Sequence, residues 1–159
     1  MTAGTSATSI TTDIVVEAPI ERAFEVFTEE FDRVKPHDHT MLDVDISESV
    51  LEPRVGGRIY DRGVDGSECV WAHVRAYEPP ERVVFSWEIS PQWQLETDPD
   101  RASEVEVRFI AESESRTRVE LEHRQLNRHL DGWEELRESV ASDDGWKIYL
   151  RRLAEAARR

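Results

Sequence analysis

The chain has 159 residues, of which 38% are hydrophobic and 34% are charged, and its formal net charge at pH 7 is -14. This length and composition are typical of one globular domain and not of a disordered chain. The acidic excess argues against nucleic acid or an anionic membrane as a partner, because both need clustered lysine and arginine.

Cysteine and lysine are both scarce. Cys69 is the only cysteine, so the chain forms no internal disulfide, which fits the reducing cytoplasm. Lysine occurs only at Lys35 and Lys147, although arginine is abundant. No stretch approaches the roughly 20 apolar residues of a membrane span. We therefore expect a cytoplasmic protein that does not associate with a membrane.

The N-terminal residues 1–9, MTAGTSATS, are small and polar. They contain neither a basic segment nor an apolar core, so they do not read as a signal peptide. We expect a disordered tail over residues 1–9 and a single folded domain over residues 10–159.

Alternation of apolar and polar residues predicts most of the regular structure. The first strand is expected over residues 10–17. Pro19 suits the first position of a helix, and an apolar stripe then predicts one short helix, or two, over residues 19–31. Further strands are expected over residues 45–52, 58–62, 68–77, 82–90, 104–112 and 116–124.

The alternation also assigns strand faces. Residues 82–90 show it most clearly, with Val83, Phe85, Trp87 and Ile89 on one face. The strand over residues 68–77 divides into one face with Cys69, Trp71 and His73 and another with Val70, Ala72 and Val74. Such patterns indicate antiparallel strands with one buried face and one face in water.

The last 29 residues are predicted to be helical. Residues 142–145, Ser-Asp-Asp-Gly, interrupt the helix and are expected to cap the part that follows. The second part carries an apolar stripe at helical spacing, formed by Trp146, Leu150, Leu153 and Ala157. Because nothing else is long enough to cover the open face of the sheet, this helix is expected to lie on it. Runs of strands without alternation of strands and helices predict an α+β fold.

One segment resembles a known family. The string from Trp71 to Trp87, WAHVRAYEPPERVVFSW, is similar to the strand–Pro-Pro–strand signature of the Activator of Hsp90 ATPase homologue-like proteins, which belong to the SRPBCC (START/Bet v 1-like) superfamily. The whole likeness spans about residues 10 to 157. Shorter similar pieces follow the family's order at residues 18–24, 51–57, 103–109, 117–123 and 145–153.

The resemblance implies a helix-grip fold, in which a curved antiparallel sheet wraps around a long C-terminal helix and leaves a cavity between them. It implies less about activity, since superfamily members include lipid carriers, cyclases, hydratases and binding modules. This chain has Val34-Lys35 and His39-Thr40 where many relatives carry a Trp-Trp pair and a His-His pair. Any family role of those pairs is therefore not carried over.

Several aromatic residues are candidate ligand-binding residues. Phe85 and Trp87 share a face that is expected to point toward the helix, and Trp93 lies in a loop that could rim a cavity mouth. Tyr60 and Trp71 are further candidates. The alternation in their strands does not show whether their rings lie on the inner or the outer face of the sheet. Each ring is also explained as ordinary core packing. As a set they suit an apolar or aromatic ligand.

His123 falls on the apolar face of its strand, together with Val119 and Leu121. A histidine there either donates into a cavity or acts as a base, because burial moves its pKa easily. The alternative, which the sequence favours, is a structural histidine whose hydrogen bonds are satisfied at the end of the sheet.

Other polar groups are assigned no chemistry. His37-Asp38-His39 looks like a metal clip but lacks a third ligand, so neither a metal nor a cofactor is expected. No catalytic set is identified. A set of glutamates on the opposite strand faces is interpreted as solvated outer surface: Glu88, Glu104, Glu106, Glu120 and Glu122.

The leading hypothesis is a small-molecule-binding protein with an apolar cavity between the sheet and the C-terminal helix. One alternative is an enzyme of cyclase or hydrolase type that uses His123 or Tyr60 as proton carrier. Another is a protein-interaction or chaperone-linked module. The partners considered are an apolar small molecule and a second copy of the chain in a homodimer.

Overall fold

The computed structural model describes residues 7–158. Residues 1–6 of the expected tail lie outside the described residues. From Thr8 onward the chain contacts the folded domain: the Leu126 amide donates a hydrogen bond to the Thr8 carbonyl oxygen at 3.0 Å.

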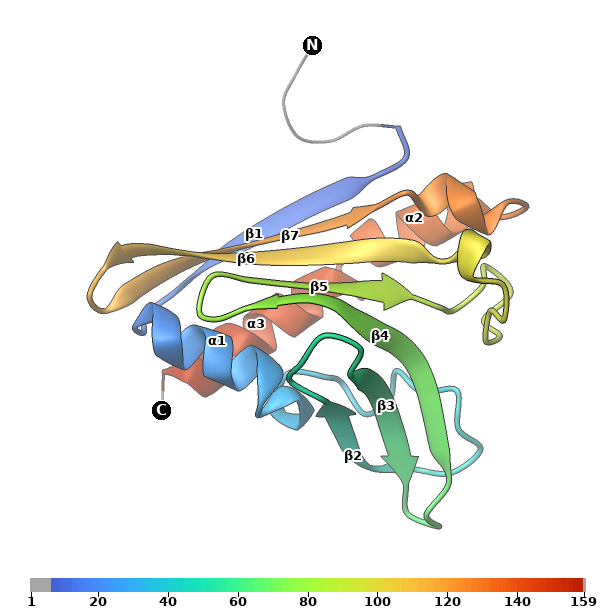
Figure 1. The fold of residues 1–159 in the computed structure, drawn as a ribbon, viewed down its shortest axis with the longest axis horizontal. Helices are drawn as coiled ribbons and strands as arrows, with labels where there is room; N and C mark the ends of the chain where they lie inside the picture. The colour runs from blue at the N-terminus through green and yellow to red at the C-terminus, as the bar shows by residue number, and fades with distance from the viewer. Residues whose placement is uncertain (1–6, 159) are drawn as a thin grey trace.

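Seven strands form one antiparallel sheet in the order β1-β7-β6-β5-β4-β3-β2. The sheet curls strongly, and the β2–β3–β4 end bends away from the long β6–β7 hairpin (Figure 1). The strands are β1 (Ile10–Val16), β2 (Ile46–Leu51), β3 (Arg58–Gly63), β4 (Glu68–Glu78), β5 (Arg82–Trp87), β6 (Ser103–Ser113) and β7 (Arg116–Arg124).

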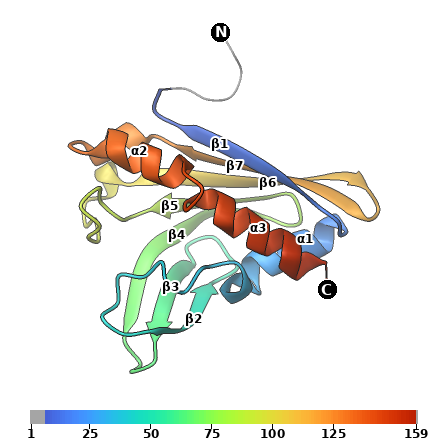
Figure 2. The same ribbon diagram turned by 180° about the vertical axis from the view of Figure 1, so that it is seen from behind.

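The helices lie against the inner, concave side of this sheet. Figure 2 shows α2 and α3 lying end to end across the strands, with α1 beside the C-terminal half of α3. The expected helix-grip fold is confirmed, although the C-terminal helix consists of two segments. The helices are α1 (Ile20–Thr28), α2 (Trp133–Ala141) and α3 (Trp146–Ala157), with short 3-10 turns η1 (Phe31–Arg33), η2 (Pro99–Arg101) and η3 (Leu126–His129).

The core lies between the sheet and the helices. All four residues of the predicted stripe on α3 are buried, and Leu153 is fully so. α3 packs on β1, and its Trp146 contacts Phe85 and Trp87 of β5 and His123 of β7. The other stripe residues belong to the same buried apolar cluster. Burial of these apolar side chains is the main stabilising contribution to the fold.

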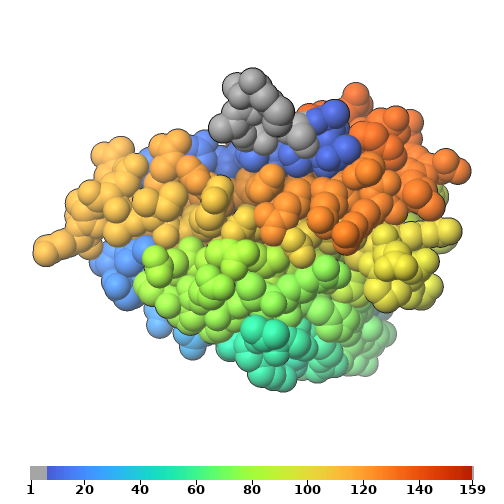
Figure 3. Space-filling view, turned by 45° about the horizontal axis from the view of Figure 1, so that its top comes forward, coloured from blue at the N-terminus to red at the C-terminus, as the bar shows by residue number. Residues whose placement is uncertain are grey.

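The outer face of the sheet carries the predicted glutamates, and no helix covers it in the view of Figure 3. Arginines from neighbouring strands pair with them: Arg124 contacts Glu104 and Glu106 at 2.6 Å each, and Arg82 also pairs with Glu106. Burial opposes ionisation of Glu106, but the hydrogen bonds from Arg82 and Arg124 lower its pKa. Within residues 7–158 the outer face is thus a network of ion pairs.

The predicted alternation is wrong in the middle of β4. On β3, Ile59 pairs with Ala72 and Tyr60 pairs with Val70, so Trp71 is an extra residue that forms a β-bulge. Trp71 and Ala72 are consequently both buried, while His73 lies on the outer face beside Glu88.

The predicted cap of the last helix is also wrong. α3 begins after Gly145, and no side chain caps it. Asp143 instead forms an exposed ion pair with Lys147 at 3.6 Å. The chain turns so tightly here that a Cβ atom at residue 145 would lie 2.1 Å from the Val140 carbonyl oxygen, which only glycine avoids.

Candidate functional site

A cavity of about 610 Å³ lies between the sheet and the junction of α2 with α3. The segment that follows η1 forms its third side. This volume falls within the range of ligand pockets, which is roughly 300–1,000 Å³. The cavity is lined by Lys35, Asp38, His39, Thr40, Met41, Asp61, Cys69, Trp71, Trp87, Ile89, Trp93, Gln94, Ser139, Val140, Asp144, Gly145, Trp146 and Tyr149.

Aromatic rings form most of one wall. Trp87 packs edge-on against Trp71 and Trp146, with ring centroids 5.6 and 5.4 Å apart. Trp146 in turn contacts Tyr149 at 4.7 Å. Trp93 is 52% exposed and lies in the loop after β5. Buried, interlocked rings make a rigid wall, and the exposed Trp93 marks the mouth.

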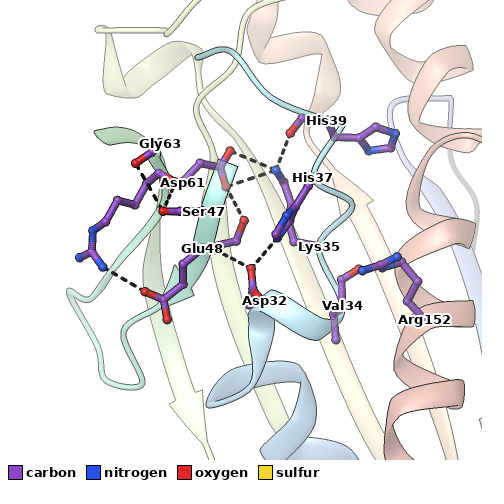
Figure 4. A network of polar contacts seen from close by, with 12 residues as sticks. Asp32, Val34, Lys35, His37, His39, Ser47, Glu48, Asp61, Gly63 and Arg152 are labelled. Atoms are coloured by element: carbon purple, nitrogen blue, oxygen red, sulfur yellow. Dashed lines mark hydrogen bonds and ion pairs between the residues drawn. The ribbon is translucent and has the colours of Figure 1, made fainter. Parts of the chain in front are cut away.

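A buried ion pair forms the polar end of the cavity. Lys35 Nζ lies 3.0 Å from Asp61 Oδ2 and 3.2 Å from Asp61 Oδ1, and it also donates to the His39 carbonyl (Figure 4). Ser49 Oγ donates to Asp61 Oδ1 at 2.8 Å. Lys35 comes from the loop after η1 and Asp61 from β3, so this pair ties the loop to the sheet.

Burial changes the acid–base properties of the lining. It lowers the pKa of Lys35, and the attraction of Asp61 opposes this shift. Burial also raises the pKa of the Cys69 thiol and that of the Tyr149 hydroxyl, and the Asp61 charge adds to both effects. Cys69 is therefore a neutral thiol and not an activated nucleophile.

The lining carries an excess of negative charge. Three carboxylates, Asp38, Asp61 and Asp144, face one amine, Lys35. With histidine neutral, these groups sum to -2, in line with the acidic chain as a whole. Desolvating an anion beside them would be costly, so the cavity disfavours anionic ligands.

The structure brings three of the six predicted ligand-binding residues to the cavity: Trp71, Trp87 and Trp93. Phe85 is fully buried behind them, in ring contact with Trp71 at 6.2 Å. Tyr60 lies on the other face of β3, where Arg58 and Arg62 cover its ring and Arg62 donates to its hydroxyl at 3.1 Å. Because Asp61 lines the cavity, its neighbour Tyr60 points away from it.

His123 is fully buried and does not line the cavity. Trp146 Nε1 donates to its Nδ1 at 3.0 Å, so its Nε2 carries the proton and donates to Ser103 Oγ at 2.7 Å. Ser103 then donates to His129 Nε2, also at 2.7 Å. Burial lowers the pKa of His123 to about 3, so it is neutral at ordinary pH.

The geometry agrees with the structural interpretation of His123. The histidine holds the indole of Trp146, one wall of the cavity, at a fixed orientation. It is not placed to act on a molecule inside the cavity, because both of its ring nitrogens are occupied.

Sequence reasoning missed the polar end of the cavity. Lys35 lies in an irregular segment, and Asp61 lies in a short strand without clear alternation. One signal was present: Lys35 is one of only two lysines in an arginine-rich chain. A compact ammonium fits a buried pair with one carboxylate, whereas a guanidinium has five donors to satisfy.

Two features are absent from residues 7–158. No cluster of three or more His, Cys, Asp or Glu side chains is arranged to hold a metal ion. None of the helices there is long and apolar enough to cross a membrane.

The sequence model of the family described as Activator of Hsp90 ATPase homolog 1-like protein matches residues 17–158. Among solved structures, the anthrahydroquino-gamma-pyrone synthase Txn09 is 35% identical with a TM-score of 0.65, and the match covers 95% of this chain and 99% of that one. The self-sacrificing resistance protein CalC from Micromonospora echinospora is 25% identical with a TM-score of 0.67, over 95% of this chain and 94% of that one.

An Hsp90 activator from Plasmodium falciparum is more distant, at 21% identity and a TM-score of 0.51, over 74% of this chain and 72% of that one. At this identity the likeness shows the fold alone. The comparison with curated proteins gave no match.

Proposed function

Because the chain belongs to the Activator of Hsp90 ATPase homolog 1-like family, whose fold leaves hollow space between sheet and helix, we propose that its cavity binds a planar ligand of fused aromatic rings. The observation that carries the proposal is the aromatic wall of Trp71, Trp87, Trp146 and Tyr149 around a cavity of about 610 Å³. Flat rings stack on such surfaces without needing many specific hydrogen bonds.

The comparisons support a ligand of this shape. A relative that is 35% identical over nearly its whole length is a synthase of an anthrahydroquino-gamma-pyrone, which is a molecule of fused rings. A second relative, at 25% identity, is a resistance protein. A synthase must bind its substrate before it acts, so binding is the more general proposal for the present chain.

An enzyme that closes a ring in this cavity is the second candidate function, and the 35% identity to the synthase favours it. Neither His123 nor Tyr60 serves as the proton carrier in this candidate, because neither lines the cavity. The buried groups available inside are Asp61, Lys35 and Tyr149. Formation of product from a bound ring precursor would distinguish this enzyme from a binding protein.

The test of binding uses phenanthrene, a neutral ligand of three fused rings, titrated against tryptophan fluorescence. We expect saturable quenching with a Kd of about 1 μM, which corresponds to a binding free energy of about 8 kcal/mol. Absence of saturable quenching up to the solubility limit of phenanthrene would contradict the proposal.

Two neighbouring variants on α2 locate the site. Ser139 lines the cavity and is exposed, so Ser139→Trp narrows the opening without disturbing the core. Glu138 is also exposed but does not line the cavity, so Glu138→Trp is the matched control. We expect Ser139→Trp to weaken binding about tenfold and Glu138→Trp to change it less than about twofold. Equal effects of the two variants would place the ligand elsewhere.

A further inference from the structure

We propose that the ligand is a neutral aromatic molecule whose hydroxyl group donates a hydrogen bond to Asp61 Oδ2. This inference rests on the proposed function and adds the polar group that the ligand must carry. It follows from an account of the donors and acceptors at the polar end of the cavity.

The Lys35 amine is directed at acceptors of the protein itself. An ammonium group has three N–H donors. Nζ donates to the His39 carbonyl oxygen and to the Asp61 carboxylate, whose Oδ1 and Oδ2 lie 3.2 and 3.0 Å away. The amine therefore holds Asp61 and the loop in place.

Asp61 keeps one acceptor position open. A carboxylate has about four acceptor positions, two on each oxygen. Oδ1 accepts from Ser49 at 2.8 Å and from Lys35, whereas Oδ2 accepts from Lys35 alone among the described residues. The Asp61 side chain is almost fully buried and lines the cavity. A buried carboxylate oxygen with an unfilled position is a specific site for a donor.

The charge of the lining decides which donor fits. Asp38, Asp61 and Asp144 outnumber Lys35, so a carboxylate or phosphate ligand would be repelled. An aromatic hydroxyl has a pKa of about 10 and stays protonated and neutral at pH 7.5. A ligand with such a group has a flat ring that can pack on the tryptophan wall and an O–H that can donate a hydrogen bond to Asp61.

Tyr149 offers a second contact to the same ligand oxygen. It lines the cavity, and no hydrogen bond to its hydroxyl is found within residues 7–158. Burial and the Asp61 charge raise its pKa, so the hydroxyl remains a donor. A ligand hydroxyl both donates and accepts, so it can bond to Asp61 and Tyr149 together.

The experiment compares 9-phenanthrol with 9-methoxyphenanthrene and phenanthrene at pH 7.5 by fluorescence titration. The methoxy compound has the same ring system and oxygen but no proton to donate. We expect wild-type protein to bind 9-phenanthrol about tenfold more tightly than 9-methoxyphenanthrene, since a hydrogen bond to a charged group is among the stronger ones.

Two variants assign this preference to Asp61. Lys35→Met with Asp61→Leu removes both charges together, which avoids leaving an unpaired buried ion. It should bind all three compounds with affinities within about threefold of one another. Glu138→Gln changes an exposed residue that does not line the cavity, so it should keep the tenfold preference as the control.

The outcomes separate the two proposals. If none of the three compounds binds wild-type protein, the proposed function fails. If all three bind equally well, the binding function stands and the Asp61 inference is overturned, whether or not the variants fold. Persistence of the preference in the double variant would also overturn it.

Discussion

Trp146, His123, Ser103 and His129 form a directional chain of buried hydrogen bonds. Each contact is 2.7–3.0 Å long, and each donor is fixed by the one before it. The chain ends at His129 Nδ1, which is buried and has no partner among the described residues. Such networks are strong when complete and costly when one member is removed.

Removal of the first donor tests this chain. Trp146→Phe keeps an aromatic ring but leaves His123 Nδ1 as an unpaired buried acceptor, so we expect a loss of about 2 kcal/mol or more in the free energy of unfolding. The control, Trp133→Phe, changes a half-buried ring for which no hydrogen bond is found within residues 7–158. Urea denaturation measures both, and equal losses would show that the hydrogen bond contributes nothing.

The two histidines also predict how stability depends on pH. Burial lowers the pKa of His123 to about 3 and that of His129 to about 4, below the value of about 6.5 for an unfolded chain. Between these values the unfolded state binds more protons, so stability is complete above pH 6.5 and falls as the pH drops.

From pH 7 to pH 5.5 we expect each histidine to lower the free energy of unfolding by about 1 kcal/mol. Urea denaturation at the two pH values measures this change. The paired carboxylates, such as Glu106, have lowered pKa values and add acid sensitivity only below about pH 4.5. A flat profile between pH 7 and 5.5 would show that the histidines are not held neutral by the fold.

At the residue scale, the sequence predicted aromatic and apolar positions better than polar ones. Trp87 was assigned to the inner face by the alternation of its strand, and Trp93 was proposed from its position in a loop; both line the cavity, as does Trp71. Lys35 and Asp61 meet only through the tertiary fold, 26 positions apart, and no local pattern predicts that contact.

At the scale of the elements, the boundaries of strands with one solvent-exposed face were predicted to within a few residues. β7 matches residues 116–124 at both ends, because its apolar and charged residues alternate without a break. β4 was mispredicted where the bulge at Trp71 shifts the register. A bulge leaves little trace in alternation, although here it puts Ala72 and Val74 among the buried residues and His73 on the outer face.

The junction of α2 and α3 gives a prediction of its own. A methyl group at Gly145 would lie 2.1 Å from the carbonyl oxygen and 2.5 Å from the carbonyl carbon of Val140, neither of which can move aside easily. We expect Gly145→Ala to cost about 2 kcal/mol or more in thermal or urea unfolding, and to weaken ligand binding because this turn lines the cavity.

Gly66→Ala is the control for this glycine. Gly66 has a φ of +87°, but nothing lies within 4 Å of an added Cβ atom, so only backbone strain of about 1 kcal/mol is expected. If both variants lose the same stability, the close approach at residue 145 does not constrain the junction.

At the scale of the whole molecule, the fold separates two environments. The outer face of the sheet is an open network of arginine–glutamate pairs, and the inner face holds an aromatic cavity with one buried ion pair. The sequence could predict this division, since it follows from alternation and from the apolar stripe of the last helix. The size of the cavity could not be predicted from the sequence, because it depends on how the two helix segments meet.

The five tryptophans allow a direct test of the central claim that the cavity binds fused aromatic rings. Four of them line the cavity, at positions 71, 87, 93 and 146, and Trp133 does not. On addition of phenanthrene to 15N-labelled protein, the indole N–H signals of those four should shift through ring currents, while that of Trp133 stays in place. Unchanged indole signals, or a shift of Trp133 as large as the others, would contradict the account.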